Sequence, residues 1–240
     1  MLPAHCLVAS RVDFRHPREP FHHRRIKQLI RDVTITMTQL VTGSTAKVRL
    51  TAEREGPRYY GHLWVFDSNV TEVLGTPAAG DLVDVYTHQK RFFGRGLFNP
   101  HSKIRIRMLT FQEEPIDEEF FAARLRAAAA LRRTVAPHAT ACRLVHGESD
   151  LLPGLVVDRF AEVAVMQTLG YGMDVRKELL GELLVQEAGV KTVYLRNDAK
   201  SRTLEGLPLS KGFLRGEGAT TVNIHEGKAQ FTVDIAEGQK

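Results

Sequence analysis

The chain has few cysteines, a single tryptophan and no long hydrophobic segment. Its two cysteines, Cys6 and Cys142, lie far apart in the 240 residues and lack the clustered spacing of a zinc site or a disulfide framework. No apolar run approaches the roughly 20 residues of a bilayer-spanning helix, and the N-terminus lacks an apolar secretory segment. These absences predict a cytoplasmic protein with no membrane partner and no metal site.

Signatures of nucleotide binding are also missing. No GxGxxG follows an expected strand, and no GxxxxGK[ST] occurs, so neither a dinucleotide fold nor a P-loop is indicated. The short patterns GRG at 94–96 and RGEG at 215–218 are typical of ordinary turns. By its own residues, the chain shows no cofactor site.

The excess of positive charge lies near the N-terminus. Residues 1–45 hold seven Lys or Arg against three Asp or Glu, and the rest of the chain holds 26 against 25. Weak periodicity and scattered prolines predict a flexible basic tail over 1–45. The tail has four histidines, whose spacing does not indicate a metal site: His5, His16, His22 and His23. Because the rest is almost neutral, nucleic-acid binding must be argued from local arrangement.

Short strands dominate residues 46–115. They are KVRL at 47–50, HLWVF at 62–66, DLVDVY at 81–86, RFFGRGLF at 91–98 and KIRIRML at 103–109. Turn-forming residues separate them. Five short strands within about 65 residues favour a small, closed or nearly closed β-barrel.

A helix and a second domain are expected after the barrel. Asp117 can cap a linker helix within 116–140, and Pro137 prevents its continuation. Residues 141–240 then predict the order strand, strand, helix, strand, strand, with strands at 155–160, 162–169 and 191–195, a helix over 174–188 and a final hairpin. The predicted fold class is therefore α+β: a small barrel, a linker helix and a β-β-α-β-β domain.

The stretch GESDLLPGLVVDRF at 147–160 allows two interpretations. Glu148, Ser149 and a distant histidine could form a hydrolase site. Pro153 and Gly154 instead favour a turn that leads into a strand. The residue types favour the turn.

The strongest candidate site is HSKIRIRM at 101–108. Alternate side chains of a strand share a face, so a row of cations is expected opposite a core-facing row of Ile104, Ile106 and Met108. Such a row could follow an RNA backbone; a merely solvated strand face is the alternative. The candidate RNA-binding residues are Lys103, Arg105, Arg107, Arg91, Arg95 and His62. Trp64 could offer a stacking surface, but a core position is favoured.

Five segments together identify a resemblance that covers residues 47–240. They are GHLWVF at 61–66, GRGLFNPHSKIRIRML at 94–109, RLVHGESDLLPGLVVDRF at 143–160, LRNDAKSRTLEGL at 195–207 and FTVDIAEGQK at 231–240. The sequence resembles the SAM-dependent methyltransferases that modify cytosine at C5 in large-subunit bacterial ribosomal RNA. Leu63 stands where that family usually has proline.

The resemblance implies a division of labour. It implies an N-terminal PUA barrel that binds ribosomal RNA, a central β-β-α-β-β domain that contains the 147–160 turn, and a catalytic Rossmann-like domain. In the family the catalytic domain follows GQK, which here ends at Lys240. No catalytic or cofactor-binding residue is therefore expected in this chain: S-adenosyl-L-methionine (SAM) is the family's cofactor but is not expected to bind the chain alone, and neither Cys6 nor Cys142 matches the nucleophile.

The expected partners are ribosomal RNA and the C-terminal methyltransferase domain, and a homodimer is left open. Two alternatives to a methyltransferase portion also stay open. One is a stand-alone PUA-type RNA-binding module without catalysis. The other is a protein-interaction scaffold whose barrel does not touch RNA.

Overall fold

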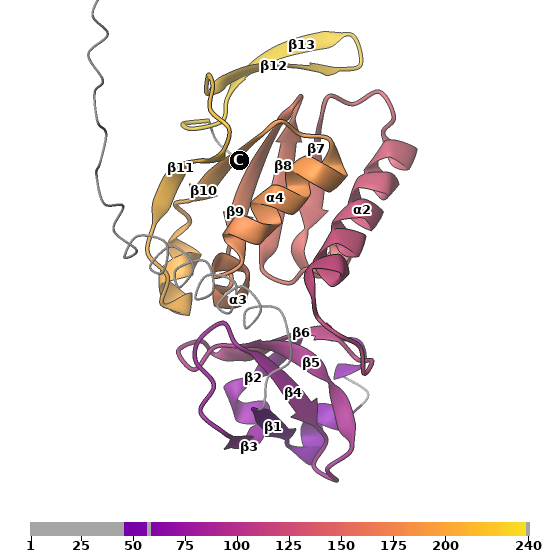
Figure 1. The fold of residues 1–240 in the computed structure, drawn as a ribbon, viewed down its shortest axis with the longest axis vertical. Helices are drawn as coiled ribbons and strands as arrows, with labels where there is room; N and C mark the ends of the chain where they lie inside the picture. Colours follow the sequence, from indigo (N-terminus) through magenta and orange to yellow (C-terminus); the bar gives the residue numbers. More distant parts are fainter. Residues whose placement is uncertain (1–45, 57–58, 239–240) are drawn as a thin grey trace, which may run out of the picture. The chain divides into compact units, whose positions relative to one another are not determined.

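The computed structural model of the chain describes residues 46–56 and 59–238. The predicted basic tail and its four histidines lie outside the described residues. The described part is α+β, as predicted, and contains two larger sheets, a two-stranded hairpin and helices (Figure 1).

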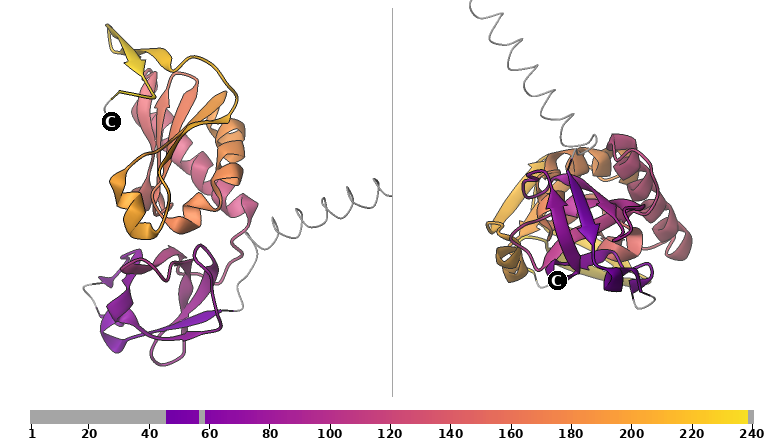
Figure 2. Two further views of the ribbon diagram at one scale, coloured as in Figure 1. Left: turned by 90° about the vertical axis from the view of Figure 1, so that its left-hand side faces the viewer. Right: turned by 90° about the horizontal axis from the view of Figure 1, so that it is seen from below.

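The first sheet takes its strands from residues 47–110 and curls strongly (Figure 2). Its strand order is β2-β6-β5-β4-β1-β3. The bounds are β1 Lys47–Leu50, β2 Trp64–Phe66, β3 Val70–Leu74, β4 Leu82–Tyr86, β5 Phe92–Phe98 and β6 Ile104–Thr110. Val48, Val65, Val85 and Ile106 are fully buried in its interior.

Strand β3 was not predicted. It pairs antiparallel with β1, with Val48 opposite Val73, and has no second neighbour in the described sheet. Its last two residues, Val73 and Leu74, are exposed. An edge strand of this kind lacks the clear alternation of buried and exposed residues that predicts a strand.

Helix α2, Glu118–Val135, follows the first sheet. The Asp117 side chain accepts a hydrogen bond from the Phe120 N–H at 3.0 Å, which confirms the predicted cap. Phe121 and Leu125 are buried on one face of the helix, as its apolar spacing indicates.

The second sheet has the strand order β11-β10-β9-β8-β7. Its strands are β7 Ala141–His146, β8 Leu155–Phe160, β9 Val163–Thr168, β10 Thr192–Asn197 and β11 Ser210–Arg215. The two edge strands, β7 and β11, add to the strands predicted. The expected helix over 174–188 is divided into α3, Tyr171–Asp174, and α4, Lys177–Ala188, which ends at Gly189 in the left-handed region.

Both faces of the second sheet are covered. Helices α2 and α4 pack on one face, where Ala164 and Met166 of β9 join the main hydrophobic cluster (Figure 1). On the other face, Val165 of β9 packs with Ile235, which follows the hairpin of β12, Thr221–Glu226, and β13, Ala229–Asp234. No helix among the described residues is both long and apolar enough to cross a membrane.

Candidate nucleic-acid interface

The core-facing half of the predicted alternation in β6 is confirmed for Ile106 and Met108, whereas Ile104 is only partly buried. Ile106 and Met108 are fully buried in the interior of the first sheet. Lys103, just before the strand, is exposed, whereas Arg105 and Arg107 are only partly exposed. The outward face of β6 is therefore not an open row of three cations.

Arg107 is held between the first sheet and the loops of the second. Its side chain is 12% exposed, and its Nη2 lies 2.8 Å from Glu205 Oε1. The guanidinium also lies 5.7 Å from the Trp64 ring and has Nη1 at 3.6 Å from Glu148 Oε1. The expectation that Arg107 lies on an open face is wrong, because carboxylates distant in sequence cover it; its role in RNA binding stays a prediction.

Glu205 collects several donors from the first sheet. Ser102 Oγ donates to Oε1 at 2.7 Å, and Asn99 Nδ2 donates to Oε2 at 3.0 Å. The Glu205 side chain is 7% exposed. A carboxylate buried to this degree is stable only when its charge and lone pairs are satisfied, and here Arg107, Ser102 and Asn99 satisfy them.

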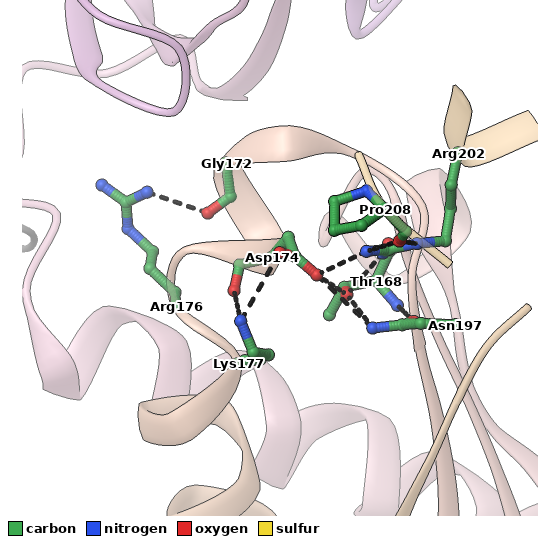
Figure 3. A network of polar contacts seen from close by, with 8 residues as sticks. All are labelled: Thr168, Gly172, Asp174, Arg176, Lys177, Asn197, Arg202 and Pro208. Atoms are coloured by element: carbon green, nitrogen blue, oxygen red, sulfur yellow. Dashed lines mark hydrogen bonds and ion pairs between the residues drawn. The ribbon is translucent and has the colours of Figure 1, made fainter. Parts of the chain in front are cut away.

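A buried polar network fixes the segment that carries Glu205 (Figure 3). Arg202 lies in the 3-10 helix Lys200–Glu205 and is 1% exposed. Its Nη2 pairs with Asp174 Oδ1 at 3.0 Å, and Thr168 Oγ donates to the same oxygen at 2.7 Å. Asn197 Nδ2 completes the network by donating to Thr168 Oγ at 2.9 Å. The 3-10 helix is thus anchored to β9, β10 and α3.

A second tie joins α3 to the first sheet. Arg176 Nη1 donates to the carbonyls of Gly80, before β4, at 2.8 Å and of Gly172 at 2.9 Å. Burial lowers the pKa of Arg176 to about 10. Two contacts made by buried side chains therefore connect the two sheets: that of Arg176 with the Gly80 carbonyl, and those of Glu205 with the first sheet.

The 147–160 stretch confirms the turn interpretation. Gly147–Asp150 form a 3-10 helix that precedes β8. Asp150 accepts from Arg132 Nη1 and Nη2 at 2.5 and 2.8 Å. Burial alone would raise the pKa of Asp150, but hydrogen bonds from Arg132 and the His146 N–H, with the Arg132 charge, lower it overall. Glu148 accepts from Trp64 Nε1 at 2.7 Å, so both carboxylates have structural partners.

The remaining candidate cations differ in how open they are. Arg95 pairs with Asp84 at 2.8 Å and also bonds the Glu114 carbonyl. Arg105 donates to the carbonyls of Asn99 and Pro100. Arg91 is exposed, and so is His62, whose Nδ1 accepts from the Trp64 N–H at 3.1 Å.

The exposed cations lie at two ends of the β5–β6 pair. Lys103 immediately precedes β6, whereas Arg91 immediately precedes β5, and the two strands are antiparallel. Asn99, at the Lys103 end of the pair, lies eight positions after Arg91 along the chain, or about 25 Å at the usual rise of a strand. The predicted set is therefore not one continuous patch.

Sequence reasoning missed an aromatic cavity at the Arg91 end. It has a volume of about 390 Å3 and is lined by five aromatic residues, a buried arginine, a glutamate and two glycines: Arg54, Glu55, Gly56, Tyr59, Tyr60, Gly61, Phe92, Phe93 and Phe111. The doublets Tyr59-Tyr60 and Phe92-Phe93 were the available signal. Phe92-Phe93 lies within the predicted strand 91–98 and Tyr59-Tyr60 just before the predicted strand 62–66, and neither position indicates that the rings share a cavity.

The sequence of the first sheet matches a known domain model. Residues 48–111 match the family model of the PUA-like domain. Among curated proteins, the chain is 40% identical over 198 residues to "Ribosomal RNA large subunit methyltransferase I" of Shewanella amazonensis, covering 81% of this chain and 50% of that protein. The protein of the same name from Vibrio cholerae is 36% identical over 182 residues, covering 75% and 46%.

Solved structures agree on the fold. A Streptococcus mutans protein, provisionally described as a SAM-dependent methyltransferase, superposes with a TM-score of 0.64 at 14% identity, covering 80% of this chain and 49% of that one. A second structure, provisionally described as a methyltransferase complexed with SAH, has a TM-score of 0.65 and the same identity and coverage. The chain spans about half the length of the curated relatives it matches.

Proposed function

We propose that the chain is the RNA-binding, N-terminal portion of a SAM-dependent methyltransferase that modifies C5 of a cytosine in large-subunit ribosomal RNA. The main support is the 40% identity to a ribosomal RNA methyltransferase over 81% of the chain, which extends well beyond the PUA-like match. The chain covers about half of this relative's length, and the proposal assigns catalysis to a separate domain of such a protein.

The first sheet is proposed to recognise mainly the sugar-phosphate backbone and the shape of the RNA. Lys103, Arg91 and His62 are exposed and contact RNA directly, and Arg105 does so from the rim of β6. Arg95 and Arg107 contribute positive potential while their ion pairs fix the strands. The second sheet braces the first through Glu205 and Arg176.

The chemistry is assigned to residues outside these 240. SAM supplies the methyl group when bound. Cytosine C5 is a weak nucleophile, so a thiolate adding at C6 is needed to activate it. Burial raises the pKa of the Cys142 thiol, which disfavours the thiolate form and is consistent with placing the nucleophile elsewhere.

RNA binding is tested by the salt dependence of affinity. The dissociation constant for a large-subunit ribosomal RNA fragment is measured at several salt concentrations for the wild-type chain and for Lys103→Ala with Arg105→Ala. Each lost phosphate contact lowers the slope of log K against log salt by roughly 0.7–0.9. Lys191→Ala is the matched control, because Lys191 is 73% exposed in an ion pair beyond the first sheet. Equal slopes in all three proteins would contradict the assignment.

The catalytic part is tested separately. The coding DNA after the Lys240 codon is read and compared with the intact mass of the native protein. A frame that continues into a methyltransferase domain, with SAM-dependent methylation of ribosomal RNA by the native protein, supports the proposal. A stop codon with an agreeing mass favours the stand-alone RNA-binding module, and RNA binding then becomes the function to test.

A further inference from the structure

The aromatic cavity beside β5 has features that core packing does not explain. Tyr60 is 94% exposed and Phe111 is 42% exposed. Phe111 stands edge-to-face against Phe93, with ring centroids 5.6 Å apart and an interplanar angle of 89°. Large aromatic side chains that line a cavity while open to water are typical of a binding surface rather than a core.

The cavity also has a buried cation with an unmet donor. Arg54 is 1% exposed, and its guanidinium donates to the carbonyls of His62 at 2.7 Å and Trp64 at 3.2 Å. Its Nε is buried and has no hydrogen-bond partner among the described residues. A buried N–H without an acceptor is costly, and Arg54 lines the cavity.

Arg54 is held in place by the aromatic residues around it. Its Cζ lies 5.0 Å from the Tyr59 ring centroid and 5.5 Å from that of Phe93. Burial lowers the pKa of Arg54, which is the expected result of removing a cation from water. The cavity thus combines rings, a fixed donor and, one residue from Phe92, the exposed cation Arg91.

We propose that this cavity receives a single unpaired RNA base. Tyr60 and Phe111 stack on the base, the buried Arg54 guanidinium places a positive charge beside it, and Arg91 faces the adjoining phosphate. The cavity volume falls within the roughly 300–1,000 Å3 of small-molecule sites. Every base offers a flat π-face and edge acceptors, and an unpaired base adds a neighbouring negative charge that Arg91 matches. This inference rests on the proposed RNA binding and specifies what the RNA must present.

The test uses two RNA hairpins that differ by one nucleotide. One has a single-nucleotide bulge with 2-aminopurine at that position, and the other is fully paired with 2-aminopurine in the stem. The wild-type chain is expected to bind the bulged hairpin more tightly than the paired one. The fluorescence of the bulged 2-aminopurine is expected to change when the base stacks on the aromatic side chains. Tyr60→Ala and Phe111→Ala are each expected to weaken binding of the bulged hairpin about tenfold and to remove the preference over the paired one.

Two controls separate this proposal from the one on which it rests. Phe231→Ala removes another exposed aromatic, 47% exposed on β13, and is expected to change neither affinity. Lys103→Ala is expected to weaken both hairpins equally. If the wild-type chain prefers neither hairpin and Tyr60→Ala changes nothing, the base-binding cavity is overturned while RNA binding stands. If the wild-type chain binds neither hairpin, both the cavity proposal and the proposed RNA binding are overturned. If it instead binds a proline-rich peptide and Tyr60→Ala abolishes that binding, the cavity proposal is overturned.

Discussion

Arg107 and Glu205, 98 residues apart in the chain, form an ion pair of 2.8 Å between a strand of the first sheet and the 3-10 helix that connects β10 and β11 of the second. Both side chains are mostly buried. Their contact, with those of Ser102 and Asn99, makes Glu205 the main polar connection between the first sheet and the segment after β10.

Glu205→Gln is expected to lower the free energy of unfolding strongly. It removes the nearer and more buried of the two carboxylates that face the Arg107 guanidinium, and breaking a buried pair in this way costs about 3–5 kcal/mol. Urea denaturation measures the effect. Glu162→Gln is the control, because Glu162 is 61% exposed in its pair with Lys191 and the expected change is under about 1 kcal/mol. Similar losses of unfolding free energy in the two variants would show that the buried Glu205 pair stabilises the fold no more than an exposed ion pair does.

Glu148→Ala is expected to shift the fluorescence of Trp64 to longer wavelength. Trp64 is the one tryptophan in the sequence, and Glu148 accepts its indole N–H at 2.7 Å. Loss of that carboxylate exposes the ring to water and costs about 1.5–3 kcal/mol, as for a hydrogen bond to a charged group. The emission spectrum of the folded variant is compared with that of Ser149→Ala, next to it on the exposed side of the loop. An unshifted spectrum in Glu148→Ala would argue against the contact.

The Asp150–Arg132 pair is expected to stabilise the fold in a pH-dependent way. Because hydrogen bonds and the Arg132 charge lower the pKa of Asp150 below its ordinary value of 3.8, the stabilisation is present above that value and is lost as the pH falls through the folded-state pKa. The free energy of unfolding is measured for wild type and Asp150→Asn between about pH 3 and pH 7. Their difference should be constant near neutrality and shrink at low pH; a constant difference throughout would contradict the assignment.

Gly94→Ala is expected to destabilise the first sheet. A Cβ at Gly94 in β5 would lie 2.3 Å from the Thr110 carbonyl oxygen of β6, so the backbone must shift, at a cost of about 3 kcal/mol. Gly227→Ala is the matched control: its φ is also positive but nothing lies within 4 Å of the added atom, and about 1 kcal/mol of strain is expected. The thermal stability of the two variants is compared by monitoring unfolding with circular dichroism. Equal losses of stability would show that the backbone relieves the crowding at Gly94 at little cost.

Local signals in the sequence predicted local structure well. The cap at Asp117 and the apolar spacing of Phe121 and Leu125 define α2, and Pro153-Gly154 defines the turn before β8. The sequence did not predict edge strands β3, β7 and β11. Each pairs with a single neighbouring strand, and such a strand can form without the regular alternation of apolar and polar residues on which the prediction relied.

The candidate site was harder to predict for a physical reason. Strand alternation places Arg107 on the outward face of β6, but alternation does not reveal what packs against that face. The carboxylates that cover it, Glu148 and Glu205, come from segments 41 and 98 residues further along the chain. The aromatic cavity likewise needs Tyr60, Phe93 and Phe111 from three separate segments.

The separation of Lys103 from Arg91 along the β5–β6 pair has a consequence for the length of nucleic acid that the chain covers. If RNA is held at both ends of this pair, the strand acts as a spacer of about 25 Å, and that spacing is set by backbone geometry rather than by any one side chain. Substitutions at either end then change how tightly RNA is held, but the footprint keeps the same length.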